Sequence, residues 1–165
     1  VEALTAMADK VNVELFTKHK VLSKTELQAR MEILLEVYSK TINIEALTSL
    51  NIAKRQILPA CMRYSGRLAE TVKSNKDAGG KAKSQPGVLE KVNVLVDSLS
   101  ANIDRLENTM THTQATKDVV KHAEVYRDTV IPAMWSVRVS ADELEKIVDA
   151  ELWPLPSYAE MMFIK

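Results

Sequence analysis

The sequence predicts an all-α fold in the form of an up-down bundle of about four helices. Glycine is scarce, with four among 165 residues, about a third of the usual ~7%. A sheet-rich fold needs more turns than so few glycines supply. Apolar residues make up 46% of the chain and recur at helical spacing along most of its length. These observations favour long helices with few connections, in a single domain over residues 1–165.

The first helix is predicted over residues 1–20. Its apolar residues follow one another at steps of four, three and four, which places them on one helical face: Leu4, Ala8, Val11 and Leu15. No capping residue precedes this pattern. We therefore expect the sequence to be a piece of a longer protein.

The second helix is predicted over residues 24–73, and its start is marked by local signals. Ser23 is placed to cap the first turn, and Glu26 is placed three residues later to bond back to it, as in a capping box. Leu22 and Leu27 stand at the two positions of a hydrophobic staple around this cap. The chain should therefore turn into a new helix near residue 24.

An apolar track runs along this second helix at about 3.75 residues per turn, more than the ~3.6 of a straight α-helix. A second row, Leu35, Leu47 and Leu58, widens the stripe toward what a core helix needs. Pro59 is predicted to kink the helix, because proline lacks a backbone N–H and crowds the preceding turn. The track consists of Leu27, Met31, Leu34, Tyr38, Ile42, Ala46, Leu50, Ala53, Ile57, Cys61, Tyr64, Leu68 and Val72.

Residues 74–87 hold three of the four glycines and no large apolar residue, so we predict a flexible loop there. A third helix is predicted over residues 88–111, where apolar residues alternate at steps of four and three. Polar residues 111–116 form the next connection. A fourth apolar track predicts a helix over residues 116–152.

The fourth helix contains two features that could interrupt it. Ser140 and Glu143 match a second capping box, but the apolar register passes through them unbroken, which favours continuity. Pro132 lies in Val-Ile-Pro-Ala, which resembles Ile-Leu-Pro-Ala around Pro59. We hypothesise that the two prolines kink the two longest helices. Pro154 and Pro156 then end the fourth helix and predict an extended, proline-rich tail over residues 153–165.

The composition excludes several classes of function. Lys plus Arg equals Asp plus Glu at 22 each, so no overall charge favours binding to nucleic acid or to an acidic membrane. No apolar run approaches the ~20 residues of a membrane span, and no signal peptide opens the chain. Cys61 is the only cysteine, which excludes a disulfide within the chain and fits a reducing compartment. The sequence therefore predicts a cytoplasmic protein with no nucleic-acid or membrane partner.

Motifs that carry chemistry are absent or incomplete. Gly79-Gly80-Lys81 lacks the other residues of a phosphate-binding loop. The three histidines have neither the Glu-x-x-His spacing of di-iron bundles nor the four-residue spacing of a helical zinc site. Cys61 lies on the apolar track, which favours packing over nucleophilic catalysis. We therefore predict no catalytic, cofactor-binding or metal-binding residue.

Two segments carry local charge. Basic residues exceed acidic ones by four in residues 63–83, and acidic residues exceed basic ones by four in residues 142–151. A solvated surface is the favoured interpretation of both, and a docking patch is the alternative.

The carboxy-terminal tail is the strongest candidate for packing or for an interface. A tail this apolar is costly to leave in water, so we expect it to cover its own bundle or, as the alternative, another part of a larger assembly. The residues predicted to make these contacts are Trp153, Leu155, Tyr158, Met161 and Phe163.

The tail, Asp149-Ala-Glu-Leu-Trp-Pro-Leu-Pro-Ser-Tyr-Ala-Glu-Met-Met-Phe163, closely resembles the carboxy-terminal end of type III glutamine synthetases. Three further segments resemble the same family in the same order: Arg30-Met-Glu-Ile-Leu-Leu-Glu-Val-Tyr-Ser-Lys-Thr-Ile-Asn-Ile-Glu-Ala46, Ala53-Lys-Arg-Gln-Ile-Leu-Pro-Ala60 and Val125-Tyr-Arg-Asp-Thr-Val-Ile-Pro-Ala-Met134. The Trp-Pro-Leu-Pro-x-Tyr ending is the specific part of this resemblance.

The resemblance implies a parent enzyme that joins ammonia to glutamate with ATP and a divalent metal ion, Mg or Mn, in stacked hexameric rings. It also implies that the nucleotide, metal and glutamate residues lie upstream, so none is assigned to this chain. The expected function is a non-catalytic carboxy-terminal domain in subunit packing, assembly or regulation. Its expected partners are the remainder of the synthetase and neighbouring subunits. The alternative is a free-standing four-helix interaction module, which an open reading frame starting just before Val1 would favour.

Overall fold

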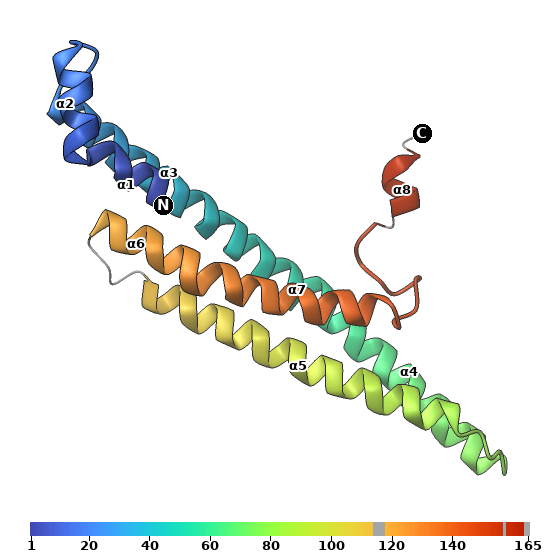
Figure 1. Cartoon of the computed structure of the whole chain (residues 1–165). Coiled ribbons are helices and arrows are strands. Elements are labelled where there is room, and N and C mark those ends of the chain that lie inside the picture. Colours follow the sequence, from blue (N-terminus) through green and yellow to red (C-terminus); the bar gives the residue numbers. More distant parts are fainter. Residues whose placement is uncertain (114–117, 157, 164–165) are drawn as a thin grey trace. The chain divides into compact units, whose positions relative to one another are not determined.

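The computed structural model describes residues 1–113, 118–156 and 158–163, and only the backbone of Tyr158 and Ala159. Every regular element in these residues is a helix, so the all-α class is confirmed (Figure 1). In the described ranges, no helix combines the length and the apolar character that a membrane crossing requires.

Contacts divide the chain into two compact units. The first consists of residues 1–48 and 106–134, and the second of residues 49–105 and 135–165. Each unit therefore combines segments that are far apart in the sequence. The prediction of a single domain over the whole chain stays a prediction.

The first unit begins with a broken helical segment, so the continuous helix predicted over residues 1–20 is wrong. Helix α1 covers Glu2–Thr5, a 3₁₀ turn covers Ala6–Ala8, and α2 covers Lys10–Lys18. Asp9 between them is extended, and the Asn12 side chain donates to the carbonyl of Ala6 at 2.7 Å. The break lets Val1 and Leu4 pack on the core. It leaves two members of the predicted track, Val11 and Leu15, exposed.

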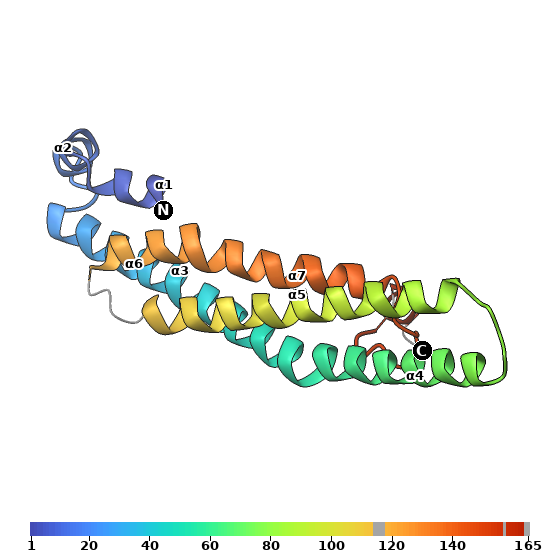
Figure 2. The same cartoon turned by 90° about the horizontal axis from the view of Figure 1, so that it is seen from below.

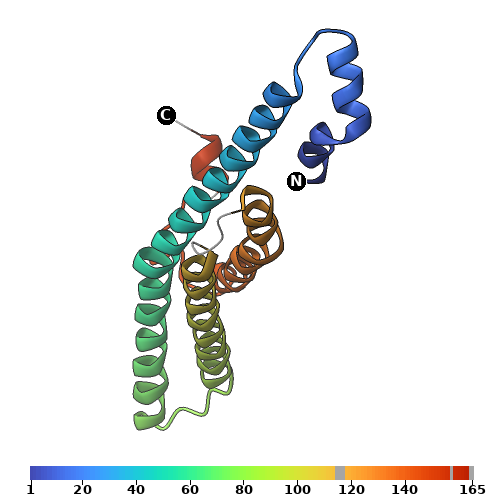
Figure 3. The same ribbon diagram turned by 90° about the vertical axis from the view of Figure 1, so that its left-hand side faces the viewer.

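The capping box at the start of α3, which covers Lys24–Ile52, is confirmed. The backbone N–H of Ser23 donates to Glu26 Oε2 at 2.7 Å, and the N–H of Glu26 donates to Ser23 Oγ at 3.3 Å. The Ser23 hydroxyl also donates to Glu26 Oε2, at 2.8 Å. The backbone bond first, and then this hydroxyl bond, hold the pKa of the Glu26 carboxyl below its usual value. Figure 3 shows the turn that this cap closes, between α2 and α3.

The helical residues continue without interruption from Lys24 to Asp77. Helix α3 is followed by a π-helical turn, Ala53–Ile57, and by α4, Leu58–Asp77. The π turn ends two residues before Pro59, where a proline would otherwise crowd the preceding carbonyls. A π turn holds more residues than an α turn, which helps explain the long 3.75-residue period of the apolar track.

The apolar track of α3 is buried only in part. Met31 and Leu35 form a core cluster with Ala123, and Val1, Leu4, Tyr38, Val119 and Val120 pack against it. Leu34 and Leu47, which the sequence places in the core stripe, are exposed. The prediction that both leucines are buried is wrong. The other segments of the first unit cover one face of α3, and these two leucines lie away from that face.

In the first unit, α6, Val119–Val125, and the π-helical turn Tyr126–Val130 pack against α3. Asp118 caps α6 by accepting from the N–H of Lys121 at 2.9 Å. Tyr126 is buried, its hydroxyl donates to Asn43 Oδ1 at 3.1 Å, and burial raises its pKa. This bond ties the π turn to α3. The predicted connection at residues 111–116 is helical through Thr113, and its remaining residues lie outside the described ranges.

In the second unit α4 lies beside α5, which covers Ser84–Thr113 and continues into the first unit (Figure 2). The connection is therefore residues 78–83, shorter than the predicted loop 74–87. Ser65 donates to Asn93 Oδ1 at 2.5 Å, and Asn75 Nδ2 donates to Gln85 Oε1 at 2.8 Å. These hydrogen bonds join the two helices, and both helices extend past their predicted bounds. Pro86 is tolerated because it lies in the first turn of α5.

Helix α7, Ile131–Glu145, directly follows the second π turn, and Pro132 lies in its first turn. The helix passes through Ser140 without a break, so the favoured continuity is confirmed. The Ser140 hydroxyl accepts from Asn102 Nδ2 at 2.9 Å and lies 3.3 Å from Ser98 Oγ. It is therefore engaged with α5 and does not cap a new helix. The helix ends seven residues before the predicted position 152, because the chain turns around Asp149.

The core of the second unit comes from the end of α3, the π turn after it, α4, α5, α7 and the turn after α7. The fully or nearly fully buried side chains among the described residues share an aliphatic character, and Cys61 lies with them as a small hydrophobe. They are Leu50, Ala53, Ile57, Ala60, Cys61, Val92, Val96, Leu99, Ile103, Val137, Ala141, Leu144 and Val148.

Candidate interaction surface in the carboxy-terminal segment

The segment after α7 forms a tight turn around Asp149. The N–H groups of Leu152 and Trp153 donate to the Asp149 carbonyl at 2.9 and 3.0 Å. The N–H of Glu151 donates to its side-chain oxygen Oδ1 at 3.0 Å. One residue thus satisfies three backbone donors, which fixes the direction in which the chain enters its two prolines. The Arg67 guanidinium lies 4.0 Å from the other Asp149 oxygen.

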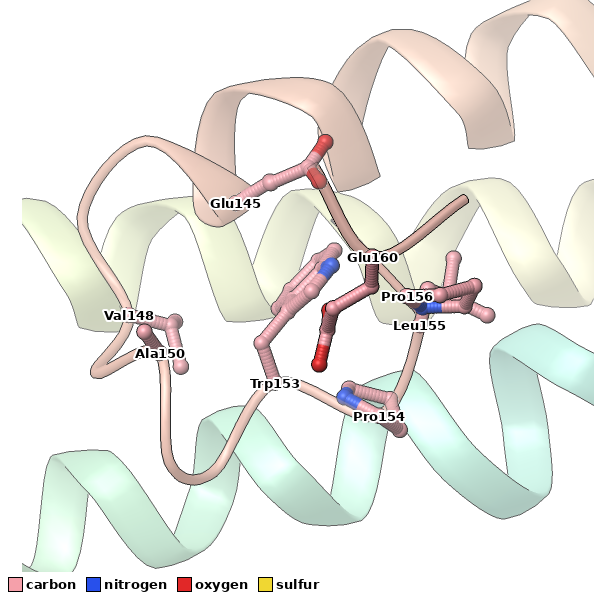
Figure 4. Close-up of a pocket in the computed structure, with 8 residues that line it drawn as sticks. All are labelled: Glu145, Val148, Ala150, Trp153, Pro154, Leu155, Pro156 and Glu160. Atoms are coloured by element: carbon pink, nitrogen blue, oxygen red, sulfur yellow. The ribbon is translucent and has the colours of Figure 1, made fainter. Parts of the chain in front are cut away.

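This turn and the following prolines enclose a pocket of about 810 Å³. Figure 4 shows the indole of Trp153 in its middle, with Glu160 beside it and Pro154 below. The remaining lining residues are Glu145, Val148, Ala150, Leu155 and Pro156. The pocket therefore combines an aromatic ring, aliphatic walls and two carboxylates.

Trp153 has a buried polar atom without a partner. Its indole Nε1 makes no hydrogen bond with any described residue. A buried N–H without an acceptor costs free energy, typically about 1–3 kcal/mol. The arrangement suits a partner that brings an oxygen acceptor to this nitrogen and apolar groups to the ring.

The predicted interface residues fall into two groups. Trp153 and Leu155 line the pocket and are partly buried. Met161 and Phe163 are exposed, Phe163 to 76%, in and just after α8, Tyr158–Met162. The side chain of Tyr158 lies outside the described residues. The prediction of an extended tail is therefore wrong for the part that forms α8. Residues 159–162 are good helix formers, and they form this short helix after Pro156.

The two charged segments meet at one described ion pair, Arg67 with Asp149. Both side chains are substantially exposed, so this pair contributes little to stability. The lysines of the basic segment, at positions 73, 76, 81 and 83, are exposed on or beside the connection between α4 and α5. Their surface location fits the favoured interpretation, a solvated face.

In the part of the chain that the structure describes, the Cys61 thiol and the His122 ring pack against other side chains. Burial raises the pKa of the Cys61 thiol to about 11, so it stays protonated at neutral pH. His122 packs edge-on against Tyr126 with ring centroids 5.0 Å apart. Among the described residues, no group of three or more His, Cys, Asp or Glu side chains could hold a metal ion. The described side chains therefore offer no set of ligands that fits a divalent metal ion.

One exposed aromatic side chain was not predicted from the sequence. Trp135 on α7 is 62% exposed, and the Arg138 guanidinium lies 5.8 Å from its ring centroid. Arg138 also pairs with Asp142 at 3.4 Å. Exposed Trp and Arg are the residue types enriched at interfaces. The helical spacing that places Val130, Val137 and Ala141 in the core puts Trp135 on the opposite face, so the periodicity of the sequence could have found its exposure.

Comparison with known proteins finds a family model described as the glutamine synthetase C-terminal domain, which matches residues 1–76. The type-3 glutamine synthetase of Dictyostelium discoideum is 34% identical over 170 aligned residues, which cover 99% of this chain. A glutamine synthetase of Butyrivibrio fibrisolvens is 28% identical over 92% of the chain, and one of Bacteroides fragilis is 27% identical over 99%. The chain spans 22–23% of the length of these relatives.

Proposed function

Because this chain belongs to the glutamine synthetase C-terminal domain family, as the C-terminal region of a type III enzyme, we propose that it is a non-catalytic helical domain. Its role is subunit packing, assembly or regulation of the parent enzyme. The parent reaction is the ATP-dependent ligation of ammonia to glutamate, carried out in the cytoplasm. The partners of the domain are the remainder of the synthetase and, in a ring oligomer, neighbouring subunits.

The observation that carries this proposal is the apolar surface of the carboxy-terminal segment. Met161, Met162 and Phe163 are each at least half exposed in the chain alone. The neighbouring pocket holds the buried, unpartnered Nε1 of Trp153. Apolar side chains in water and an unsatisfied donor both favour association with another surface. The residues proposed for this contact are Trp153, Leu155, Tyr158, Met161 and Phe163.

The same proposal includes the architecture and the placement of the cofactors. The helices form an up-down bundle of about four, in which the two long ones bend at Pro59 and Pro132. The π-helical turns directly before both prolines support such bends. ATP and the divalent metal ion bind in the part of the parent enzyme outside this chain. The reason for this placement is the family resemblance, which implies that the nucleotide and metal residues lie upstream of this chain.

Deleting residues 151–165 from the full-length enzyme tests the role of this segment. We expect a smaller or less stable assembly, because the pocket wall and the exposed apolar residues are lost together. Light scattering after size exclusion measures the assembly, and its thermal midpoint measures its stability.

The double substitution Met161→Ser with Phe163→Ser tests the same point without shortening the chain. Glu151→Gln is the matched control, since this exposed side chain lies in the same segment but does not line the pocket. If the deletion leaves assembly, stability and activity all unchanged, the proposed role of the segment is wrong.

A further inference from the structure

Helix α3 is apolar on two opposite faces. One face is buried in the first unit through Leu27, Met31, Leu35, Ile42 and Ala46. The other carries an outer stripe that consists of Ile33, Val37, Ile44 and Leu47, with exposures of 60, 54, 64 and 53%. Their spacing of four, seven and three residues places these side chains in one row along the helix. A helix that is apolar on both faces is normally buried on both.

The outer stripe is long enough and neutral enough to be an interface. It extends over 14 residue steps, about 21 Å at ~1.5 Å per residue. Lys40 falls in the same row, between Val37 and Ile44, and is exposed, but its charge is paired with Glu36 at 2.8 Å. A partner would therefore have to accommodate one ion pair within the stripe. Permanent interfaces are more apolar than transient ones. The stripe therefore has the character of a permanent contact.

A pocket continues the outer stripe toward the start of α3. It has a volume of about 500 Å³ and shares Ile33 with the stripe. Its walls are mostly aliphatic, with one carboxylate and one guanidinium at the side: Met7, Glu26, Ala29, Arg30, Ile33 and Leu34. Interfaces concentrate their binding energy where a large side chain fills such a pocket.

We propose that the outer stripe and its pocket dock the part of the synthetase that lies outside these 165 residues. The inference rests on the proposed function and deepens it, by naming a second contact surface and its occupant. The occupant is an apolar segment of the parent chain with a large aliphatic or aromatic side chain that enters the pocket. The surface lies in the first unit, whereas the carboxy-terminal segment belongs to the second.

Two findings support this choice of occupant. The relatives are about four times longer than this chain, which covers 22–23% of them, so most of the surface available for a permanent contact lies outside it. The family model matches residues 1–76, and these contain the entire outer stripe and its pocket. The uncovered apolar face therefore lies inside the segment that matches the family model, and the relatives match 92–99% of the chain, this segment included.

Thiol labelling of the full-length enzyme tests whether the outer stripe is covered. A cysteine is introduced by Ile44→Cys, or by Asp104→Cys as the control at an exposed polar position of α5. The labelling rate in the native assembly is compared with the rate of the same protein unfolded in urea, using peptide mass mapping. We expect protection of about tenfold or more at position 44 and little at position 104. Equal rates at the two positions would overturn the proposal.

A photoreactive cross-linker attached to the same introduced cysteine identifies the occupant. Cross-linked peptides from outside residues 1–165 support the proposal. Cross-links to residues 1–165 of another subunit would show that a second copy covers the stripe and would overturn it. Position 44 is exposed in the chain alone, so the substitution leaves the buried core intact.

The outcome is separable from that of the tail deletion. An unprotected position 44 together with an assembly that depends on residues 151–165 removes this inference and keeps the proposed function. A protected position 44 with no effect of the deletion keeps the docking surface and removes the role of the tail.

Discussion

At the scale of single residues, two helix ends use the same motif with different residues. After α2, the N–H of Lys20 donates to the Thr17 carbonyl and that of Val21 to the Phe16 carbonyl, at 3.1 and 3.0 Å. Gly79 and Gly80 repeat this pattern after α4. Both motifs place one residue in the left-handed region, Lys20 at φ 55° and Gly79 at φ 77°. Only glycine adopts this conformation without a steric cost.

Exchanging the residues at these two ends should change stability in opposite directions. Lys20→Gly should raise the free energy of unfolding by about 0.5–1 kcal/mol, because it removes the left-handed strain of a side chain. Gly79→Ala should lower it by about 1 kcal/mol for the same reason. Chemical denaturation of the 165-residue chain measures both.

The control for this pair is Gly66→Ala. An added Cβ at Gly66 meets no atom within 4 Å, and the residue lies inside α4. This substitution should therefore stabilise by up to about 1 kcal/mol. A loss of stability in Lys20→Gly would show that the lysine side chain contributes more than its backbone strain costs.

At the scale of elements, buried polar contacts set how two helices of the second unit meet. Asn102 on α5 donates to Ser140 Oγ at 2.9 Å and to the Ser136 carbonyl at 3.3 Å on α7. Ser140 is 5% exposed, and its hydroxyl also donates to the Ser136 carbonyl and lies 3.3 Å from Ser98 Oγ, so loss of either partner weakens a buried polar network. This contact also explains why a sequence that matches a capping box at Ser140 continues as helix.

A double-mutant cycle on this contact measures its energy. Asn102→Ala and Ser140→Ala should each lower the free energy of unfolding by about 1 kcal/mol. The double variant should lose less than their sum, with a coupling of about 0.5–1.5 kcal/mol. Thr71→Ala is the control, because its exposed hydroxyl bonds only to Arg67 in its own helix. Full additivity of the two substitutions would contradict a direct interaction.

At the scale of the whole molecule, the chain divides into two compact units, and its formal net charge is zero. Each unit has its own buried set, and Cys61 lies in that of the second with 0% exposure. Its thiol is protonated at neutral pH because burial raises its pKa to about 11. The thiol can therefore report on opening of the whole second unit.

Alkylation of Cys61 should be slow in the native protein and should follow unfolding of this unit. At pH 8 a pKa of about 11 leaves about one thiol in a thousand as thiolate. The rate, measured by mass spectrometry, should rise steeply with urea as the unit opens. The same chain in high urea supplies the reference rate. Fast native labelling would show that Cys61 is accessible and would revive a reactive role.

Much of the fold follows from local sequence signals. The all-α class follows from helical periodicity and scarce glycine, and the start of α3 follows from Ser23 and Glu26, whose mutual bonds need no distant partner. Pro154 and Pro156 do not set the end of α7, which stops at Glu145 where the chain begins its turn around Asp149. The family resemblance likewise depends on residue identity and order, which the comparisons bear out over 99% of the chain.

What local signals leave open is which apolar face is covered. Periodicity assigns Leu34, Leu47 and Val11 to buried stripes, yet all three are exposed, because the face that a helix buries depends on the segments that pack against it. The break at Asp9 and the early end of α7 are decided in the same way, by Val1 and Leu4 packing on the core and by the turn around Asp149. Burial is a property of distant contacts, so only the tertiary structure separates the side chains that stabilise this fold from those left free to bind a partner.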